Sequence, residues 1–173
     1  MPAILLTNDD GVDSPGLTAL ESALEPLGNI TIVAPDRERS ATSHSLTLNE
    51  PLRYHQVASN RYAVQGTPAD CIILAALRIM KERPAIVVAG VNRGSNVGDD
   101  VNYSGTVAGA AEAALQSIPG IAISAHASPQ TNFAGAAGVA AVLARRALET
   151  GLPQDVILNV NYPEQWNGEV RWT

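Results

Sequence analysis

The sequence predicts an α/β fold in which helices cover both faces of a mainly parallel sheet. Two features lead to this prediction. Short apolar runs of strand length alternate with stretches of helical periodicity, as in successive βαβ units. These runs do not alternate polar and apolar residues, which is typical of strands buried on both faces. The predicted core strands cover residues 3–7, 30–34, 85–89, 121–124 and 156–160.

The first half of the chain contains a clear helix start and a hairpin signal. Ser14 is typical of an N-cap and Pro15 of the first helical position. The leucines that follow recur on one helical face until Gly28, which predicts the end of this helix. Residues 52–57 and 61–65 flank a short polar turn, so we predict a small β-hairpin beside the main sheet.

Three further helices are predicted downstream of the hairpin. Thr67 and Pro68 repeat the cap-and-proline signal and predict a helix over residues 67–81. Alanine-rich stretches with an apolar stripe predict two more helices, over residues 106–117 and 133–150. No internal repeat or low-complexity linker interrupts this order, so we expect one domain over the whole 173-residue chain.

The composition limits the classes of function. A net charge of −6 argues against nonspecific binding to nucleic-acid polymers, which depends on a basic surface. The single cysteine, Cys71, excludes an internal disulfide and a Cys-based zinc site, and its apolar neighbours predict a buried thiol. The sequence shows no signal-peptide pattern and no apolar stretch of about 18 residues. We therefore expect a cytoplasmic protein without a membrane span.

Polar residues gather in the loops that follow the first three core strands. Ligands of open α/β sheets bind outside the carboxyl ends of the strands. If the sheet is doubly wound, all three loops lie at one edge and form a single site. Their sequences are "TNDDG", "PDRERSATSHS" and "GVNRGSNVGDDVNYSGT".

The adjacent carboxylates Asp9 and Asp10 have two interpretations. They repel each other, and a cation beside them would keep both ionised. Oxygen ligands from Asp, Asn and Ser suit a hard ion such as Mg²⁺ or Mn²⁺. Alternatively, Asn8 and Gly11 make the stretch a tight turn in which the carboxylates hold no ion.

The third loop is rich in glycine and leads into a predicted helix. Backbone of this kind can approach an anion closely, and Ser104, Gly105 and Thr106 at the helix start form a candidate phosphate site. The other interpretation is a simple Ser/Thr cap. Arg93 in the same loop either neutralises an anion or is a solvated charge.

Other candidates have weaker support. His44 is either a general acid or base or a surface residue, and Asp99 with Asp100 is either a second acidic pair or a solvated loop tip. No G-x-G-x-x-G follows the first strand, which argues against a standard dinucleotide fold. The Walker A pattern and the G-x-S-x-G elbow are also missing.

These loops resemble the stationary-phase survival protein SurE family, which are metal-dependent 5′/3′-nucleotidases. The resemblance implies a Rossmann-like three-layer α/β/α sandwich that hydrolyses nucleoside 5′-monophosphates to nucleoside and phosphate. Nucleoside 3′-monophosphates and short polyphosphate are further candidate substrates. The matching stretches, in the family's order, are "ILLTNDDGVDSPG", "VVAPDRERSATSHSLTL", "GTPADC" and "IVVAGVNRGSNVGDDVNYSGTVAGAAEA".

The resemblance also implies residue roles. One divalent ion, Mg²⁺ or Mn²⁺, is assigned to Asp9, Asp10, Ser40 and Asn92, and all four residue types are intact. Asp9 and Asp10 are the implied catalytic residues, with Asp9 favoured as base or water-positioning group. The residues implied in phosphate or substrate binding are Asn96, Ser104, Gly105 and Thr106, and those expected to support them are Asn8, Gly11 and Arg93.

The family usually continues well beyond the last residue of this chain, with a C-terminal extension that helps to build dimers or tetramers. We therefore expect a single SurE-like nucleotidase domain that lacks this extension. The expected partners are a nucleoside monophosphate and further copies of the chain, as a homodimer or larger homo-oligomer.

Two alternatives stay open. Haloacid-dehalogenase-like phosphatases use an aspartate nucleophile after the first strand, but they need D-x-D where this chain has "DDG". A nucleotide-binding regulatory module without turnover belongs to a different class and would use the same loops.

Overall fold

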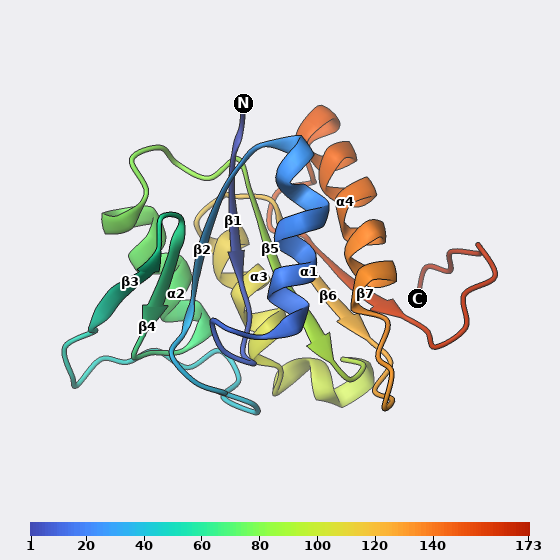
Figure 1. Ribbon diagram of the computed structural model, residues 1–173, viewed down its shortest axis with the longest axis horizontal. Coiled ribbons are helices and arrows are strands. Elements are labelled where there is room, and N and C mark those ends of the chain that lie inside the picture. Colours follow the sequence, from blue (N-terminus) through green and yellow to red (C-terminus); the bar gives the residue numbers. More distant parts are fainter.

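The computed structural model describes residues 1–173, and its seven strands form one sheet in the order β3-β4-β2-β1-β5-β6-β7 (Figure 1). Only the β3–β4 pair is antiparallel, so the mainly parallel sheet and the hairpin at its edge are confirmed. The strands are β1 (Ala3–Thr7), β2 (Asn29–Pro35), β3 (Tyr54–Ala58), β4 (Arg61–Val64), β5 (Ile86–Arg93), β6 (Gly120–Ala125) and β7 (Ile157–Tyr162).

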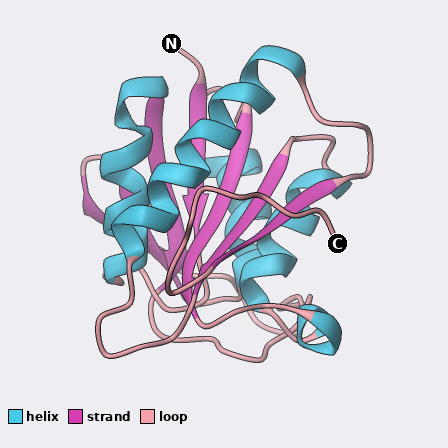
Figure 2. Cartoon of the chain, turned by 90° about the vertical axis from the view of Figure 1, so that its right-hand side faces the viewer, coloured by secondary structure: helices cyan, strands magenta, loops and turns pink.

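Four α-helices cover the two faces of the sheet. They are α1 (Pro15–Leu24), α2 (Pro68–Leu74), α3 (Gly105–Leu115) and α4 (Phe133–Thr150). Helices α1 and α4 pack together on one face, and α2 and α3 pack together on the other. Figure 2 shows the sheet between these layers, with loops gathered at its lower end, where the parallel strands end.

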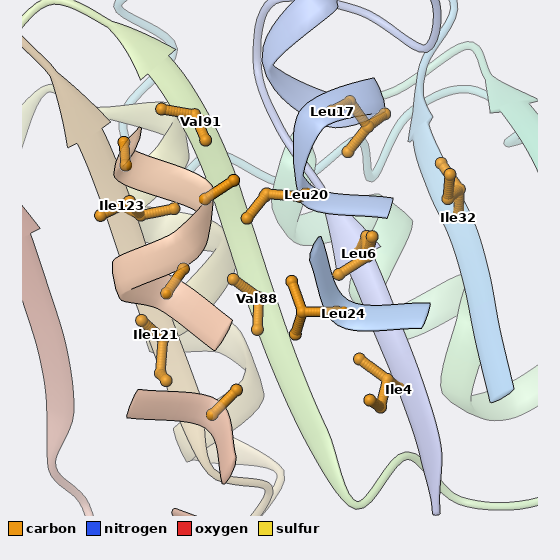
Figure 3. Packing of buried hydrophobic residues seen from close by; sticks show 14 of the residues in the cluster. Ile4, Leu6, Leu17, Leu20, Leu24, Ile32, Val88, Val91, Ile121 and Ile123 are labelled. Atoms are coloured by element: carbon orange, nitrogen blue, oxygen red, sulfur yellow. The ribbon is translucent and has the colours of Figure 1, made fainter. Parts of the chain in front are cut away.

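The larger hydrophobic core lies between the sheet and the α1–α4 layer (Figure 3). Leu17, Leu20 and Leu24 share one face of α1 and pack in the same cluster as Ile4 and Leu6 of β1. All five side chains are fully buried. Each such side chain stabilises the fold by about 1.5–3 kcal/mol. The leucine spacing in the sequence therefore predicted the buried face of α1 correctly.

The predicted helix over residues 67–81 is too long. Helix α2 ends at Leu74, and one π-helical segment carries the chain to Ile79. Met80 is already extended, with a ψ of 138°. Pro84 lies four residues further on, and a proline disfavours helical backbone just before it. No helical stretch could therefore have continued far past this point.

Strand β5 is longer than predicted and runs to Arg93 instead of ending at residue 89. Its pairing with β6 is irregular between Ala89 and Asn92, then resumes with Asn92 opposite Ser124. Gly90 lies in this irregular stretch with a φ of 136°, a conformation that favours glycine. A glycine inside a strand often marks a bulge, so the loop predicted to begin at this glycine is instead a continuation of the strand.

The first helix is shorter than predicted, because α1 ends at Leu24 and a 3₁₀ turn over Glu25–Leu27 leads to Gly28. Its predicted start and the predicted burial of Cys71 are confirmed. The Ser14 hydroxyl accepts a hydrogen bond from the Leu17 N–H at 3.3 Å, and Pro15 opens α1. The Cys71 thiol is fully buried. None of the helices combines the length and the apolar character needed to cross a bilayer.

Candidate functional site

The topology of the sheet places the site between β1 and β5. From β1 the chain builds the sheet outward through β2, then returns to the other side of β1 to add β5, β6 and β7. Where the strand order reverses, neighbouring loops diverge and leave a crevice at the carboxyl ends. The aspartate pair follows β1, and Asn92 lies near the end of β5. The two therefore flank this switch point.

A hollow of about 760 Å³ opens at this edge of the sheet. Its lining includes six carboxylates and two arginines, so its charge is strongly negative. Asn8, Gly105 and Thr106 lie outside the lining. The predicted site residues that line it are Asp9, Asp10, Gly11, Ser40, Asn92, Arg93, Asn96 and Ser104.

The turn after β1 is built by Asn8. Its buried side-chain amide donates hydrogen bonds to the Gly11 carbonyl at 3.0 Å and to Ser14 Oγ at 2.6 Å. Its Oδ1 accepts from the Gly11 N–H at 3.2 Å, and Gly11 has a φ of 105°. The stretch is thus a tight turn, but one that does not use the carboxylates of Asp9 and Asp10. Turn and ion site are therefore compatible.

Asp9 is almost completely buried against the start of α3. Its Oδ1 accepts a hydrogen bond from Thr106 Oγ1 at 2.5 Å. A Cβ at Gly105 would lie 2.9 Å from Asp9 Oδ2, so only glycine allows the helix to come this close. Burial raises the pKa of Asp9, while hydrogen bonds from Thr106 oppose the shift.

Asp10 is the more perturbed partner. Burial, followed by the charges of Asp9 and Glu38, raises the pKa of Asp10 to about 6. Three carboxylates thus share one region, and a bound cation would relieve their repulsion. No group of three or more His, Cys, Asp or Glu side chains is arranged as a metal site. An ion beside Asp9 and Asp10 would therefore also need amide or hydroxyl oxygens.

Ser40 and Asn92 offer such oxygens in the same hollow. The amide nitrogen of Asn92 donates to the Gly94 carbonyl at 2.8 Å, which leaves its Oδ1 as the free acceptor. The exposed Ser40 hydroxyl donates to Glu38 Oε1 at 2.7 Å. This set of oxygen donors fits a hard divalent ion.

The predicted phosphate-binding residues divide into two groups. Asn96 and Ser104 line the hollow, and the Ser104 hydroxyl also caps α3 by accepting from the Val107 N–H at 3.1 Å. Thr106 is fully buried and turns its hydroxyl to Asp9. Gly105 lies against the Asp9 side chain. The start of α3 therefore contacts the side chain of Asp9 through Gly105 and Thr106.

Comparison with known proteins identifies the family. The family model described as "Survival protein SurE" matches residues 4–173. The chain belongs to this family. It is similar to the "5'-nucleotidase SurE" of Geobacter sulfurreducens, with 53% identity over 93% of this chain and 62% of that protein. The "5'-nucleotidase SurE" of Pelobacter propionicus is 50% identical over 97% of this chain and 68% of its own length.

A solved structure shows the same fold. The crystal structure of the SurE protein from Aquifex aeolicus matches with a TM-score of 0.90 and 44% sequence identity, over 95% of this chain and 67% of that one. The α/β fold predicted from the sequence is thus the fold of the SurE family. The chain spans about two thirds of the length of these relatives.

Two groups near the site of this SurE-family chain were not predicted from its sequence. Glu38 lines the hollow and accepts a hydrogen bond from the Ser40 hydroxyl, although its charged run, "DRER", is typical of a solvated turn. Asn159 and Asn161 of β7 donate hydrogen bonds to the Asn96 carbonyl at 2.9 and 3.1 Å. The available signal was a pair of asparagines spaced by two in a strand that is otherwise apolar.

His44 lies outside the hollow, and the second acidic pair reaches the hollow with only one of its two carboxylates. His44 Nε2 lies 2.9 Å from Glu112 Oε2 on α3, outside the lining of the hollow. This contact ties the loop after β2 to α3. Asp99 and Asp100 are exposed in a 3₁₀ turn, and Asp100 alone reaches the hollow.

Proposed function

We propose that this chain is a metal-dependent phosphomonoesterase that hydrolyses nucleoside 5′-monophosphates to nucleoside and phosphate. One observation carries the proposal: two adjacent carboxylates, one buried and one half-buried and both with raised pKa values, face a hollow at the switch point of the sheet. The similar proteins named 5'-nucleotidase SurE supply the reaction class. Nucleoside 3′-monophosphates and short polyphosphate are proposed as further substrates.

The proposed metal ligands are Asp9, Asp10, Ser40 and Asn92, and the proposed ion is Mg²⁺ or Mn²⁺. Such an ion supplies positive charge against the phosphate oxygens and lowers the pKa of a coordinated water. The ion is needed because the hollow has more carboxylates than arginines and would otherwise repel a phosphate. Neither Arg37 nor Arg93 could alone offset that charge.

The chain's own residues then have separate roles. Thr106 holds Asp9 by one oxygen, which leaves the other oxygen to orient an attacking water or to accept its proton. Arg93 and the Ser104 hydroxyl line the hollow and would bind the phosphate oxygens, together with Asn96. Thr106 and Gly105 are thus proposed to support Asp9, in place of the direct phosphate contact expected from the sequence.

A phosphate-release screen tests the proposal. Nucleoside 5′- and 3′-monophosphates, polyphosphate and a simple phosphate ester are each incubated with the chain in Mn²⁺, in Mg²⁺ and in EDTA. We expect release from 5′-monophosphates that needs the ion and is lost in Asp9→Asn. The matched control is Asp155→Asn, an exposed carboxylate outside the hollow, which should keep wild-type activity.

Three results would contradict the proposal in different ways. Binding of nucleoside monophosphate without phosphate release would favour the regulatory module. Full activity in EDTA or in Asp9→Asn would remove the metal-centred mechanism. A phosphoaspartate trapped at Asp9 would favour a nucleophilic aspartate. The single-domain organisation, the homo-oligomer and the cytoplasmic location stay predictions.

A further inference from the structure

A row of polar side chains crosses the carboxyl ends of β5, β6 and β7. Asn92 is the register partner of Ser124, and Ser124 is the register partner of Asn161. Partners in neighbouring parallel strands point to the same face of a sheet. Two residues before Ser124, Ala122 packs with α3 on that face. The face therefore changes from apolar packing to polar contacts at its last row, and Ser124 is fully buried there.

The backbone of Asn96 is clamped onto this row. Its N–H donates to Asn161 Oδ1 at 2.8 Å, and its carbonyl accepts from Asn161 Nδ2 at 3.1 Å. The amide of Asn159 donates to the same carbonyl at 2.9 Å. Both hydrogen-bonding groups of the Asn96 backbone are therefore used by β7. The clamp fixes the place from which the Asn96 side chain reaches the hollow.

The side-chain amide of Asn96 has one partner inside the protein. Its Nδ2 donates to Ser124 Oγ at 2.7 Å, whereas its Oδ1 has no hydrogen-bond partner. This Oδ1 is accessible to solvent, and Asn96 lines the hollow. In this orientation Asn96 presents an acceptor, which an ionised phosphate oxygen cannot use.

Rotating the side-chain amide of Asn96 by half a turn exchanges the positions of Oδ1 and Nδ2 without any other movement. A serine hydroxyl both donates and accepts, and an amide has an oxygen and a nitrogen in equivalent places. After the half-turn, the Ser124 hydroxyl donates to Asn96 Oδ1, and Nδ2 faces the hollow as a donor. The Ser124 proton, which has no acceptor in the first orientation, then gains one.

We propose that Ser124 is a positioning residue that holds the Asn96 amide with its Nδ2 toward a phosphate oxygen of the substrate. Asn159 and Asn161 position the Asn96 backbone for the same contact. The inference rests on the proposed function, since that function makes phosphate the ligand. Alanine at position 124 would leave the amide without an internal partner and free to present either atom.

The test measures the affinity of inorganic phosphate for the Mn²⁺-loaded chain by isothermal titration calorimetry. We expect Ser124→Ala to weaken phosphate binding about tenfold, and Asn96→Ala by about tenfold or more, since a hydrogen bond to a charged group is lost. Asn96→Asp should bind phosphate more weakly than Asn96→Ala, because a carboxylate repels the anion. Ser124→Thr keeps the hydroxyl and should retain most of the affinity. The matched control is Ser22→Ala, an exposed hydroxyl on α1.

Two additional readouts separate positioning from a merely structural role. The affinity for Mn²⁺ without phosphate should be the same in Ser124→Ala and the wild type. The side-chain amide resonances of Asn96, followed by NMR on ¹⁵N-labelled chain, should shift when phosphate is added to the wild type.

The inference is overturned if Ser124→Ala binds phosphate like the wild type, or if the wild type binds none. It is also overturned if Asn96→Asp binds phosphate as well as Asn96→Ala does, since Asn96 would then act as an acceptor. If the wild type binds phosphate with this variant pattern but releases none from nucleotides, the inference stands and the proposed function fails.

Discussion

The two loops that carry three of the four proposed metal ligands are held in place in different ways. The turn after β1 is closed by Asn8, whose partners lie three and six residues away in the chain. The loop after β2, which carries Ser40, has no regular structure over residues 38–53 and depends on distant anchors. His44 reaches Glu112, 68 residues further on, and Thr47 reaches Asp70, 23 residues further on. The first turn is thus closed by local hydrogen bonds, whereas the second loop is held by distant parts of the fold.

Because the two loops are held differently, substitutions in them should have different effects on the site. A substitution that opens the first turn should affect both Asp9 and the start of α1, because Asn8 also donates a hydrogen bond to the N-cap Ser14. Damage to an anchor of the second loop should loosen Ser40 while Asp9 and Asp10 stay in place. Stability, ion affinity and turnover measured on the same variants can therefore separate the two loops.

The largest effect is expected for Asn8→Ala, which removes the local closure. Its three buried hydrogen bonds disappear, and the Gly11 groups lose their partner. We expect the free energy of unfolding to fall by about 3 kcal/mol, with turnover lost as well. Urea denaturation and the phosphate-release assay measure the two. Asn29→Ala, an exposed asparagine at the start of β2, is the control. An unchanged unfolding midpoint in Asn8→Ala would show that the turn closes without this side chain.

Gly105→Ala tests one of the distant contacts of the first turn, the packing of Asp9 against the start of α3. A Cβ at this position would lie 2.8 Å from the Cβ of Asp9 and would push that side chain away. We expect turnover to fall by about tenfold to a hundredfold, since small displacements of reacting groups are costly. The unfolding free energy should change little, because the higher helix preference of alanine, up to about 1 kcal/mol over glycine, offsets the cost of the close contact with Asp9.

Gly138→Ala is the matched control for this prediction. Gly138 lies inside α4, and a Cβ there would meet no atom within 4 Å. The substitution should raise stability by up to about 1 kcal/mol and leave turnover unchanged. Equal activity of the two variants would mean that Asp9 tolerates displacement.

The same contrast explains which features could be predicted from the sequence. The Ser14 cap, the leucine face of α1 and the two aspartates follow from residues a few positions apart. The Thr106–Asp9 bond joins residues 97 apart, and the Asn96–Asn161 bond joins residues 65 apart. No local pattern indicates such pairs. The family resemblance selected Ser40 and Asn92, whereas periodicity alone missed that β5 extends past Gly90 to carry Asn92.

Asp70→Asn tests the distant anchor of the second loop. The buried Asp70 carboxylate accepts from the Thr47 N–H at 3.0 Å, the Thr47 hydroxyl at 2.7 Å and the Thr67 N–H at 2.9 Å. An amide can replace only one of the two oxygens, so at least one bond is lost in either orientation. We expect a loss of about 2 kcal/mol in stability and a several-fold weaker Mn²⁺ affinity.

A double-mutant cycle with Thr47→Val sharpens the Asp70 prediction. The two residues share two hydrogen bonds, and Thr47→Val removes the one from the hydroxyl. The double variant should therefore lose less stability than the sum of the single variants. Mn²⁺ affinity, measured by calorimetry on the same proteins, should follow the same order. If Asp70→Asn lowers stability but leaves Mn²⁺ affinity intact, Ser40 does not depend on this anchor.

The smallest effect, and one of opposite sign, is expected for Asp10→Asn in the chelated protein. The pKa of Asp10 is raised in the folded state from 3.8 to about 6, chiefly by burial. The folded state therefore binds the proton more tightly than the unfolded state does. The stability that this protonation contributes is fully present below the lower pKa and is lost as the pH rises through about 6. At pH 8 the ionised carboxylate destabilises the fold, and an amide does not.

Asp10→Asn should accordingly raise the free energy of unfolding at pH 8 in EDTA by about 1 kcal/mol, a value reduced for the partial exposure of this side chain. At pH 4 the gain should nearly vanish, because the wild-type carboxyl is then protonated in the fold. Urea denaturation at the two pH values, with Asp155→Asn as control, measures the difference. A gain of the same size at both pH values would mean that packing, not charge, is responsible. The predicted pattern would show that the protein sacrifices stability to keep two carboxylates together where an ion is proposed to bind.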